Sequence, residues 1–180
     1  MQYYRKEIQI HKNVISDVFS NFKPNTKMLV FGLGYDSKMW YEGNNKNTYF
    51  IENNDSYIRL NEKDIPSKNI IKYNYVGITC QNSTTLTDEQ ISRYICPPAL
   101  LKEGPFDIII IDGPEGNNDT KPGRLLPTYW SCNFLSKPGT IVYIDDSKRS
   151  IETYCIQKYF KDRVVRVFPE RTGCTKIIAS

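Results

Sequence analysis

The chain has few of the residues on which several kinds of catalytic site depend. It contains one histidine, His11, and none of its five cysteines lies in a C-x-x-C pair. We expect His11 on the surface of an N-terminal helix, which excludes a Ser-His-Asp triad and a histidine-ligated metal. The odd number and the spacing of the cysteines argue against a zinc site or a disulfide framework. The sequence therefore predicts reduced thiols and a cytoplasmic location.

Long hydrophobic runs and a strong charge imbalance are also absent. No apolar run approaches the ~20 residues of a membrane-spanning helix, and the first 13 residues, MQYYRKEIQIHKN, lack the apolar core of a signal peptide. A net charge of +4 is too small to predict a nucleic-acid-binding surface. The 180 residues, 39% of them hydrophobic, are ordinary for a globular chain. We therefore expect a single domain over residues 1–180, with no membrane span and no nucleic-acid partner.

Short and nearly continuous apolar runs alternate with helical patterns along the chain. Such runs are typical of parallel strands buried on both faces, so the alternation predicts an α/β fold. The five predicted parallel strands are Lys27–Phe31, Thr48–Glu52, Asn69–Tyr73, Phe106–Ile111 and Thr140–Ile144. The predicted helices cover residues 5–22, Ser37–Tyr41, Asp55–Glu62, a segment opened by a capping box at Thr87 and closed by Pro97-Pro98, Leu125–Leu135 and Ser150–Phe160.

The last two apolar runs, Val164–Phe168 and Thr175–Ala179, break this alternation. Only residues 169–174 separate them, which leaves no room for a helix, so we expect an antiparallel hairpin. A seven-stranded, mostly parallel sheet that ends in such a hairpin is the Rossmann-like arrangement of class I methyltransferases, which use S-adenosylmethionine (SAM). A dehydrogenase-type nucleotide-binding domain would instead continue with parallel crossovers.

Residues 28–37, MLVFGLGYDS, predict a nucleotide-type cofactor site. Their apolar run ends in Gly32-Leu33-Gly34, whose glycines let the backbone approach a ligand closely. The next run ends in Glu52, placed 18 residues after Gly34, where a carboxylate can accept hydrogen bonds from ribose hydroxyls. Ser37 stands where a dinucleotide site has its third glycine, so the pattern favours a cofactor without a pyrophosphate, such as SAM. The predicted cofactor-binding residues are Gly32, Leu33, Gly34, Asp36, Ser37, Glu52 and Asn53.

Three carboxylates follow the fourth and fifth predicted strands. Asp112 comes directly after four isoleucines, and Asp145 and Asp146 follow Ile144. In an open α/β sheet the ligand crevice lies outside these strand ends. Three carboxylates there repel one another, and a hard divalent cation such as Mg²⁺ or Mn²⁺ resolves the repulsion. The sequence therefore predicts a metal site at Asp112, Asp145 and Asp146, with helix capping as the alternative role of the last two.

Three segments, FGLGYDSKMW (31–40), YFIENN (49–54) and FDIIIIDGPEG…PGR (106–124), resemble the glucuronoxylan 4-O-methyltransferase family. The resemblance extends over about residues 20–165. It implies a SAM-dependent transfer of a methyl group to a sugar hydroxyl of a polysaccharide. On this basis Gly32, Gly34, Asp36, Ser37 and Trp40 map to the cofactor loop, Glu52 to the ribose acid, and Asp112 and Arg124 to the fourth-strand and PGR segments.

The sequence departs from that family at three places. Tyr35 replaces a histidine, Asn53 stands in place of a second acid, and Asp145-Asp146 stands where the family tends to have His-Asp. One acid after the fourth strand and two after the fifth are instead similar to the metal-dependent macrolide and aminocoumarin sugar O-methyltransferases. That likeness supports the three aspartates as metal ligands and leaves the sugar open.

The polar loop EGNNDTKPGR, residues 115–124, is long enough to cover the site. Glu115 or Asp119 could act as the base that takes the proton from the acceptor hydroxyl. The cations that could hold sugar hydroxyls or an acidic sugar are Arg124, Lys148 and Arg149, each of which could equally be a solvated surface charge. Our predicted catalytic residues are Asp112, Glu115 and Arg124.

The sequence thus predicts a SAM-dependent O-methyltransferase acting on a sugar or oligosaccharide, assisted by a divalent metal. An NAD-type oxidoreductase is an alternative, against which Ser37 and the terminal hairpin argue. A methyltransferase-fold module that binds glycan without turnover is a second alternative, and the acids at all the expected strand ends argue against it. An RNA or protein methyltransferase is a third, but the chain lacks the basic, aromatic-rich groove expected for nucleic acid.

Overall fold

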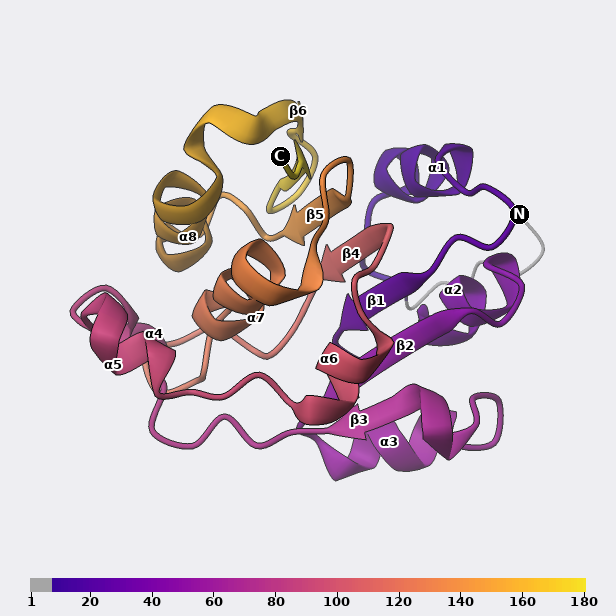
Figure 1. Ribbon diagram of the computed structural model, residues 1–180, viewed down its shortest axis with the longest axis horizontal. Helices are drawn as coiled ribbons and strands as arrows, with labels where there is room; N and C mark the ends of the chain where they lie inside the picture. The colour runs from indigo at the N-terminus through magenta and orange to yellow at the C-terminus, as the bar shows by residue number, and fades with distance from the viewer. Residues whose placement is uncertain (1–7) are drawn as a thin grey trace.

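A sheet of seven strands forms the centre of the part of the chain that the computed structural model describes, residues 8–180 (Figure 1). Its strand order is β3-β2-β1-β4-β5-β7-β6, and β7 runs antiparallel to both β5 and β6, whereas the other neighbours are parallel. The strands are β1 (Met28–Phe31), β2 (Thr48–Glu52), β3 (Ile70–Lys72), β4 (Ile108–Ile111), β5 (Ile141–Asp145), β6 (Val164–Phe168) and β7 (Cys174–Ile178). The predicted mostly parallel sheet with an antiparallel C-terminal hairpin is confirmed.

The four isoleucines of β4 show why the central strands are apolar throughout. β4 pairs with β1 on one side and β5 on the other, and all four side chains are buried. Ile108 and Ile110 pack into the core on one face of the sheet, and Ile109 and Ile111 pack into the core on the other. Because helices cover both faces, neither set of alternating side chains meets water. Each such burial contributes roughly 1.5–3 kcal/mol.

The helices are α1 (Lys12–Ser20), α2 (Ser37–Gly43), α3 (Asp55–Asn61), α4 (Cys80–Ser83), α5 (Asp88–Ser92), α6 (Pro98–Glu103), α7 (Leu125–Trp130) and α8 (Ser150–Phe160). Two 3₁₀ turns, η1 (Ser67–Asn69) and η3 (Lys161–Arg163), and a π-helical turn, η2 (Ser131–Leu135), complete the set. The apolar faces of α1 and α2 pack on one side of the sheet, and those of α6, α7 and α8 pack on the other.

Two segments differ from their predicted helices. The predicted N-terminal helix begins at Lys12, and residues 5–7 of its expected span lie outside the described residues. The predicted helix from Thr87 ends early, at Ser92, and Pro98 opens a further helix, α6, instead of only closing the one before. Proline is tolerated in the first turn because its missing N–H would be unpaired there in any case.

Two structural findings bear on the predictions about the cysteines and about a membrane span. The five cysteines, all within the described part of the chain, are free thiols. Among residues 8–180, no helix combines the length and the hydrophobicity needed to cross a membrane.

Candidate functional site

The carboxyl ends of β2, β1 and β4 border a cavity of about 710 Å³. This volume is within the ~300–1,000 Å³ usual for small-ligand sites. Of the residues predicted from the sequence, those that line it are Gly32, Leu33, Gly34, Asp36, Glu52, Asn53, Asp112, Glu115, Arg124, Asp146 and Arg149. Ser37 and Asp145 are not among its lining residues. Tyr35 and Tyr57, which the sequence analysis did not propose, also line it. We refer to this space as the larger cavity.

Two glycines bring the loops after β1 and β4 into backbone contact. Gly32 has a φ of +112°, a conformation that side chains with a Cβ rarely adopt. Its N–H donates to the carbonyl of Ile51 over 2.9 Å, which ties the loop to β2. A Cβ on Gly113 would lie 2.9 Å from the Cα of Gly32, closer than such contacts normally allow. Both positions therefore require glycine if the two loops are to lie this close.

Ser37 and Asp36 hold the glycine loop from within. The hydroxyl of Ser37 is fully buried and accepts a hydrogen bond from the N–H of Gly34 over 2.9 Å. The carboxylate of Asp36 accepts a hydrogen bond from the indole N–H of Trp40 over 2.6 Å. Burial raises the pKa of Asp36, and the bond from Trp40 opposes that shift. Ser37 thus supports the loop, and its predicted direct contact with the cofactor stays a prediction.

Glu52, at the end of β2, uses both of its carboxylate oxygens. Oε2 accepts from the N–H of Leu33 over 2.8 Å, and Oε1 accepts from the N–H groups of Asn53 and Asn54, each over 2.7 Å. Burial raises the pKa of Glu52, while these three backbone donors lower it. A carboxylate offers about four lone-pair positions, so Glu52 can still accept from hydroxyl groups in the larger cavity.

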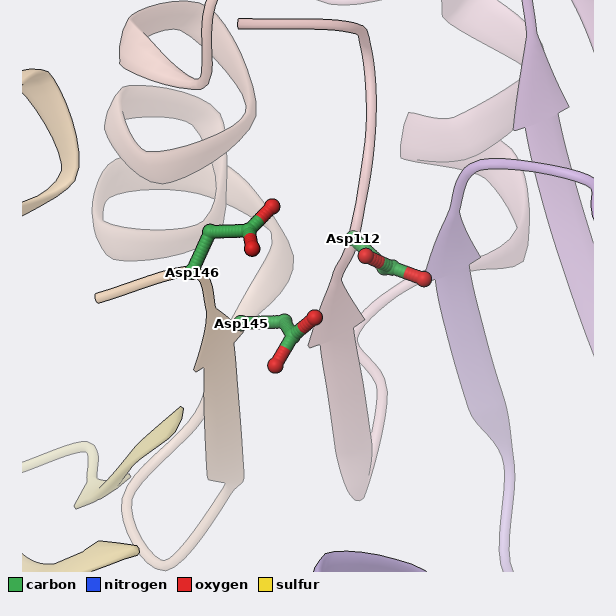
Figure 2. Close-up of side chains that lie close together, drawn as sticks. All are labelled: Asp112, Asp145 and Asp146. Atoms are coloured by element: carbon green, nitrogen blue, oxygen red, sulfur yellow. The ribbon is translucent and has the colours of Figure 1, made fainter. Parts of the chain in front are cut away.

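The three predicted metal ligands lie together at the carboxyl ends of β4 and β5 (Figure 2). One carboxylate oxygen from each of Asp112, Asp145 and Asp146 lies within 4.8 Å of the others. Burial, and then the neighbouring Asp145, raises the pKa of Asp112 well above its usual range. Burial also raises the pKa of Asp145. These three oxygen donors match the ligands that Mg²⁺ and Mn²⁺ prefer, so the residues fit such an ion.

Arg124 provides a counter-charge within this cluster of acids. Its side chain is almost fully buried, and Nη2 donates to Asp146 Oδ2 over 2.6 Å and to Asp112 Oδ1 over 3.2 Å. Nη1 donates to the backbone carbonyl of Asp145. Arg149 also contacts Asp146 Oδ2, over 2.9 Å. The sequence predicted a metal as the only compensating charge and Arg124 as a group that holds the acceptor. Its position directly before the buried Leu125-Leu126 was the available signal that it lies inside.

Glu115 lies at the rim of the larger cavity. Its side chain is half exposed, and Oε2 forms an ion pair with Lys121 Nζ over 2.5 Å. Glu115 is therefore exposed enough to accept a proton from a ligand in the larger cavity. Its ion pair with Lys121 does not connect it to the acid cluster. Its role as the base stays a prediction.

A smaller cavity of about 130 Å³ adjoins the larger one. The two share Gln9, Asp112, Asp146 and Arg149 in their walls. The other residues lining the smaller cavity are His11, Val14, Asp145, Glu170, Arg171, Thr172, Gly173 and Cys174. The predicted surface position of His11 is only partly right, because its side chain is 28% exposed and lines this cavity. Segments that are distant in the sequence meet at this cavity, so no local sequence pattern predicts it.

The chain is similar to known proteins over most of its length. The sequence matches the IRX15/IRX15L/GXM family over residues 6–167. Glucuronoxylan 4-O-methyltransferase 2 of Arabidopsis thaliana is 27% identical over 81% of this chain and 56% of its own length. Arabinogalactan O-methyltransferase 2 of the same plant is 27% identical over 91% of this chain and 64% of its own. The chain thus spans between 56% and 64% of the length of these curated relatives.

Among solved structures, human methyltransferase-like protein 13 in complex with SAH superimposes with a TM-score of 0.52. The match covers 94% of this chain and 82% of that one, at 12% identity. At this identity the likeness establishes the fold alone. Together with the strand order, it confirms the class I methyltransferase fold.

Proposed function

Since the chain belongs to the IRX15/IRX15L/GXM family, we propose that it is a SAM-dependent O-methyltransferase that transfers a methyl group to a sugar hydroxyl of a glycan. One observation carries this proposal: a single cavity joins the glycine loop and Glu52 to Asp112 and Asp146. The first pair suits a nucleoside, and the second suits a reacting hydroxyl. The names of the two plant relatives support a glycan acceptor.

The residues divide the work along the edge of the sheet. Glu52 would accept hydrogen bonds from the ribose, and the backbone at Gly32 and Gly34 would lie against the methionine portion. SAM supplies an electrophilic methyl group. Where it holds no metal, the carboxylate of Asp112 or Asp145 would accept the proton that the hydroxyl loses. Burial raises the pKa of both groups, which makes each ionised carboxylate a stronger proton acceptor. Holding the two reactants side by side at this edge of the sheet would add a proximity contribution.

Metal assistance is a separate part of the proposal. Asp112, Asp145 and Asp146 would hold Mg²⁺ or Mn²⁺, which would lower the pKa of a bound hydroxyl. Arg124 and Arg149 already offset part of the acid charge. The alternative is a metal-independent form of the same transfer, in which the arginines alone balance the charge of the acids. The contacts of Arg124 and Arg149 with Asp146 favour it.

The experiment is to incubate the protein with labelled SAM and oligosaccharides from glucuronoxylan and arabinogalactan, with and without Mg²⁺ or Mn²⁺. We expect label in an oligosaccharide and micromolar binding of SAH by calorimetry. Absence of both would refute the proposed function. Asp145→Asn should abolish any metal stimulation, whereas the matched exposed change Asp162→Asn should leave it unaltered. Activity that EDTA and Asp145→Asn both leave intact would favour the metal-independent form.

A further inference from the structure

We propose that the smaller cavity is the acceptor subsite, and that Oε2 of Glu170 accepts a hydrogen bond from a hydroxyl of the sugar unit bound there. This inference rests on the proposed function. It assigns a binding role to the turn between β6 and β7, a part of the chain that the cofactor site does not use.

The order of the strands places this cavity on the acceptor side. Glu52 follows β2, the glycine loop follows β1, and Asp112 follows β4, so the larger cavity runs along three neighbouring strands. The smaller cavity begins at Asp112 and Asp146 and continues to the turn that precedes β7. A methyl donor in the larger cavity and a hydroxyl in the smaller one would therefore meet beside these two carboxylates.

The chemistry of the smaller cavity suits a polyhydroxylated ligand. Its wall holds charged side chains of both signs, among them Glu170, Asp146, Arg149 and Arg171. A sugar hydroxyl can donate a hydrogen bond to a carboxylate and accept one from a guanidinium, so it can bond to side chains of either charge. Among residues 8–180, no Phe, Tyr or Trp side chain lines this cavity, so its only ring is the imidazole of His11. The volume of about 130 Å³ admits one small ring rather than several.

Glu170 lines the smaller cavity and has a carboxylate oxygen without a hydrogen-bond partner. Its Oε1 accepts from the side-chain amide of Asn13 over 2.6 Å and lies 3.9 Å from Nδ1 of His11. Its Oε2 is buried and has no hydrogen-bond partner within the described chain. Buried polar atoms nearly always have a partner, so an unpaired carboxylate oxygen beside a cavity indicates a ligand group.

The turn itself fixes the position of this carboxylate. The N–H of Gly173 donates to the carbonyl of Glu170 over 3.0 Å, which closes the turn. The guanidinium of Arg171 donates to the backbone carbonyl of Gln9, so the segment before α1 is fastened over the cavity. Glu170 is thus held in place before any acceptor binds, which reduces the entropy lost on binding.

Two variants separate a binding role from a structural one. Glu170→Gln keeps an oxygen for Asn13 but replaces the free oxygen with a donor group. Asn13→Ala removes the internal bond and leaves the free oxygen untouched. We expect Glu170→Gln to raise the KM for a glucuronoxylan oligosaccharide about tenfold, as for a lost hydrogen bond to a charged group. We expect kcat and the SAH dissociation constant to stay unchanged, and Asn13→Ala to have a much smaller effect.

Glu89→Gln, an exposed change on α5, is the matched surface control. If Asn13→Ala raises KM and Glu170→Gln does not, Glu170 only anchors the segment before α1 and the proposal is wrong. Calorimetric titration of the same oligosaccharide in the presence of SAH separates this outcome from failure of the proposed function. Binding that depends on Glu170 without methyl transfer would support the subsite and refute the transferase. Transfer by wild type that Glu170→Gln leaves unaltered would refute the subsite alone.

Discussion

The carboxylate of Glu52 accepts a hydrogen bond from the backbone N–H of Leu33 over 2.8 Å. The acid at the end of β2 therefore holds the glycine loop at the end of β1 in place. A charged acceptor for a backbone donor is worth more than a neutral one. Glu52 consequently has two tasks, because it shapes the loop and also presents oxygen to the larger cavity. Changes at this residue should affect the cofactor more than the fold.

We expect Glu52→Gln to weaken SAH binding by about tenfold to a hundredfold, which corresponds to the loss of one or two charge-assisted hydrogen bonds. Glutamine keeps one acceptor oxygen, so it cannot serve the Leu33 amide and the amides of Asn53 and Asn54 together. Isothermal titration with SAH measures the effect, with the exposed Glu62→Gln as the matched control. Equal affinity in wild type and Glu52→Gln would show that this acid takes no part in cofactor binding.

The sequence identified the part of the site in which short motifs follow strand ends. Gly32, Glu52 and Asp112 each come directly after an apolar run, and parallel strands bring their carboxyl ends to one edge of the sheet. The mostly parallel sheet and its antiparallel end followed from the alternation of helices and strands and from the terminal hairpin. These features are local in the chain, so a reader of the sequence can find them.

The remaining parts depend on contacts between distant segments. His11 and Glu170 are 159 positions apart, yet both line the smaller cavity. Arg124 was found by its PGR motif, but nothing local shows that its guanidinium would pair with Asp112 and Asp146. Whether a cluster of acids is balanced by a metal or by an arginine is decided by tertiary packing.

Gly113→Ala should destabilise the protein by about 1–3 kcal/mol, the usual cost of overpacking, and should weaken SAH binding. The new Cβ would lie 2.9 Å from the Cα of Gly32 and force the two loops apart. Gly139→Ala is the control, because its Cβ meets nothing within 4 Å but its φ of +88° is unfavourable for alanine. It should lower stability without affecting SAH binding. Equal SAH affinity in both variants would contradict the prediction.

Arg124→Met should cost about 3–5 kcal/mol, because it leaves buried carboxylates without their partner. Chemical denaturation measures this loss. Adding Asp146→Asn to the same chain should recover part of the stability, since one of the unpaired charges is then removed. Mg²⁺ should stabilise Arg124→Met more than wild type if the three aspartates hold a cation. A double variant that is less stable than Arg124→Met would show that the ion pair between Asp146 and Arg149 outweighs the repulsion that Asp146→Asn relieves.

Asp17 links α1 to the sheet, and its replacement should produce a stability loss that depends on pH. Its Oδ2 accepts from the Tyr143 hydroxyl over 2.6 Å and from Lys176 Nζ over 2.7 Å, and its Oδ1 pairs with Arg166 over 3.1 Å. Burial acts to raise the pKa of Asp17, but the bonds from Lys176 and Tyr143 and the charge of Arg166 outweigh it and hold that pKa below 3.8.

A lowered carboxylate pKa stabilises the folded state above the unfolded pKa, and the contribution is lost as the pH falls through the folded one. We therefore expect Asp17→Asn to lower the free energy of unfolding by about 2 kcal/mol at pH 7, as for charged hydrogen bonds. The difference from wild type should stay constant down to about pH 5 and shrink below 3.8. Urea denaturation between pH 3 and 8 measures it, with the exposed Asp162→Asn as the control. A difference that grows as the pH falls would mean that the folded state favours the protonated form of Asp17. The ion pair with Lys176 would then contribute no net stability.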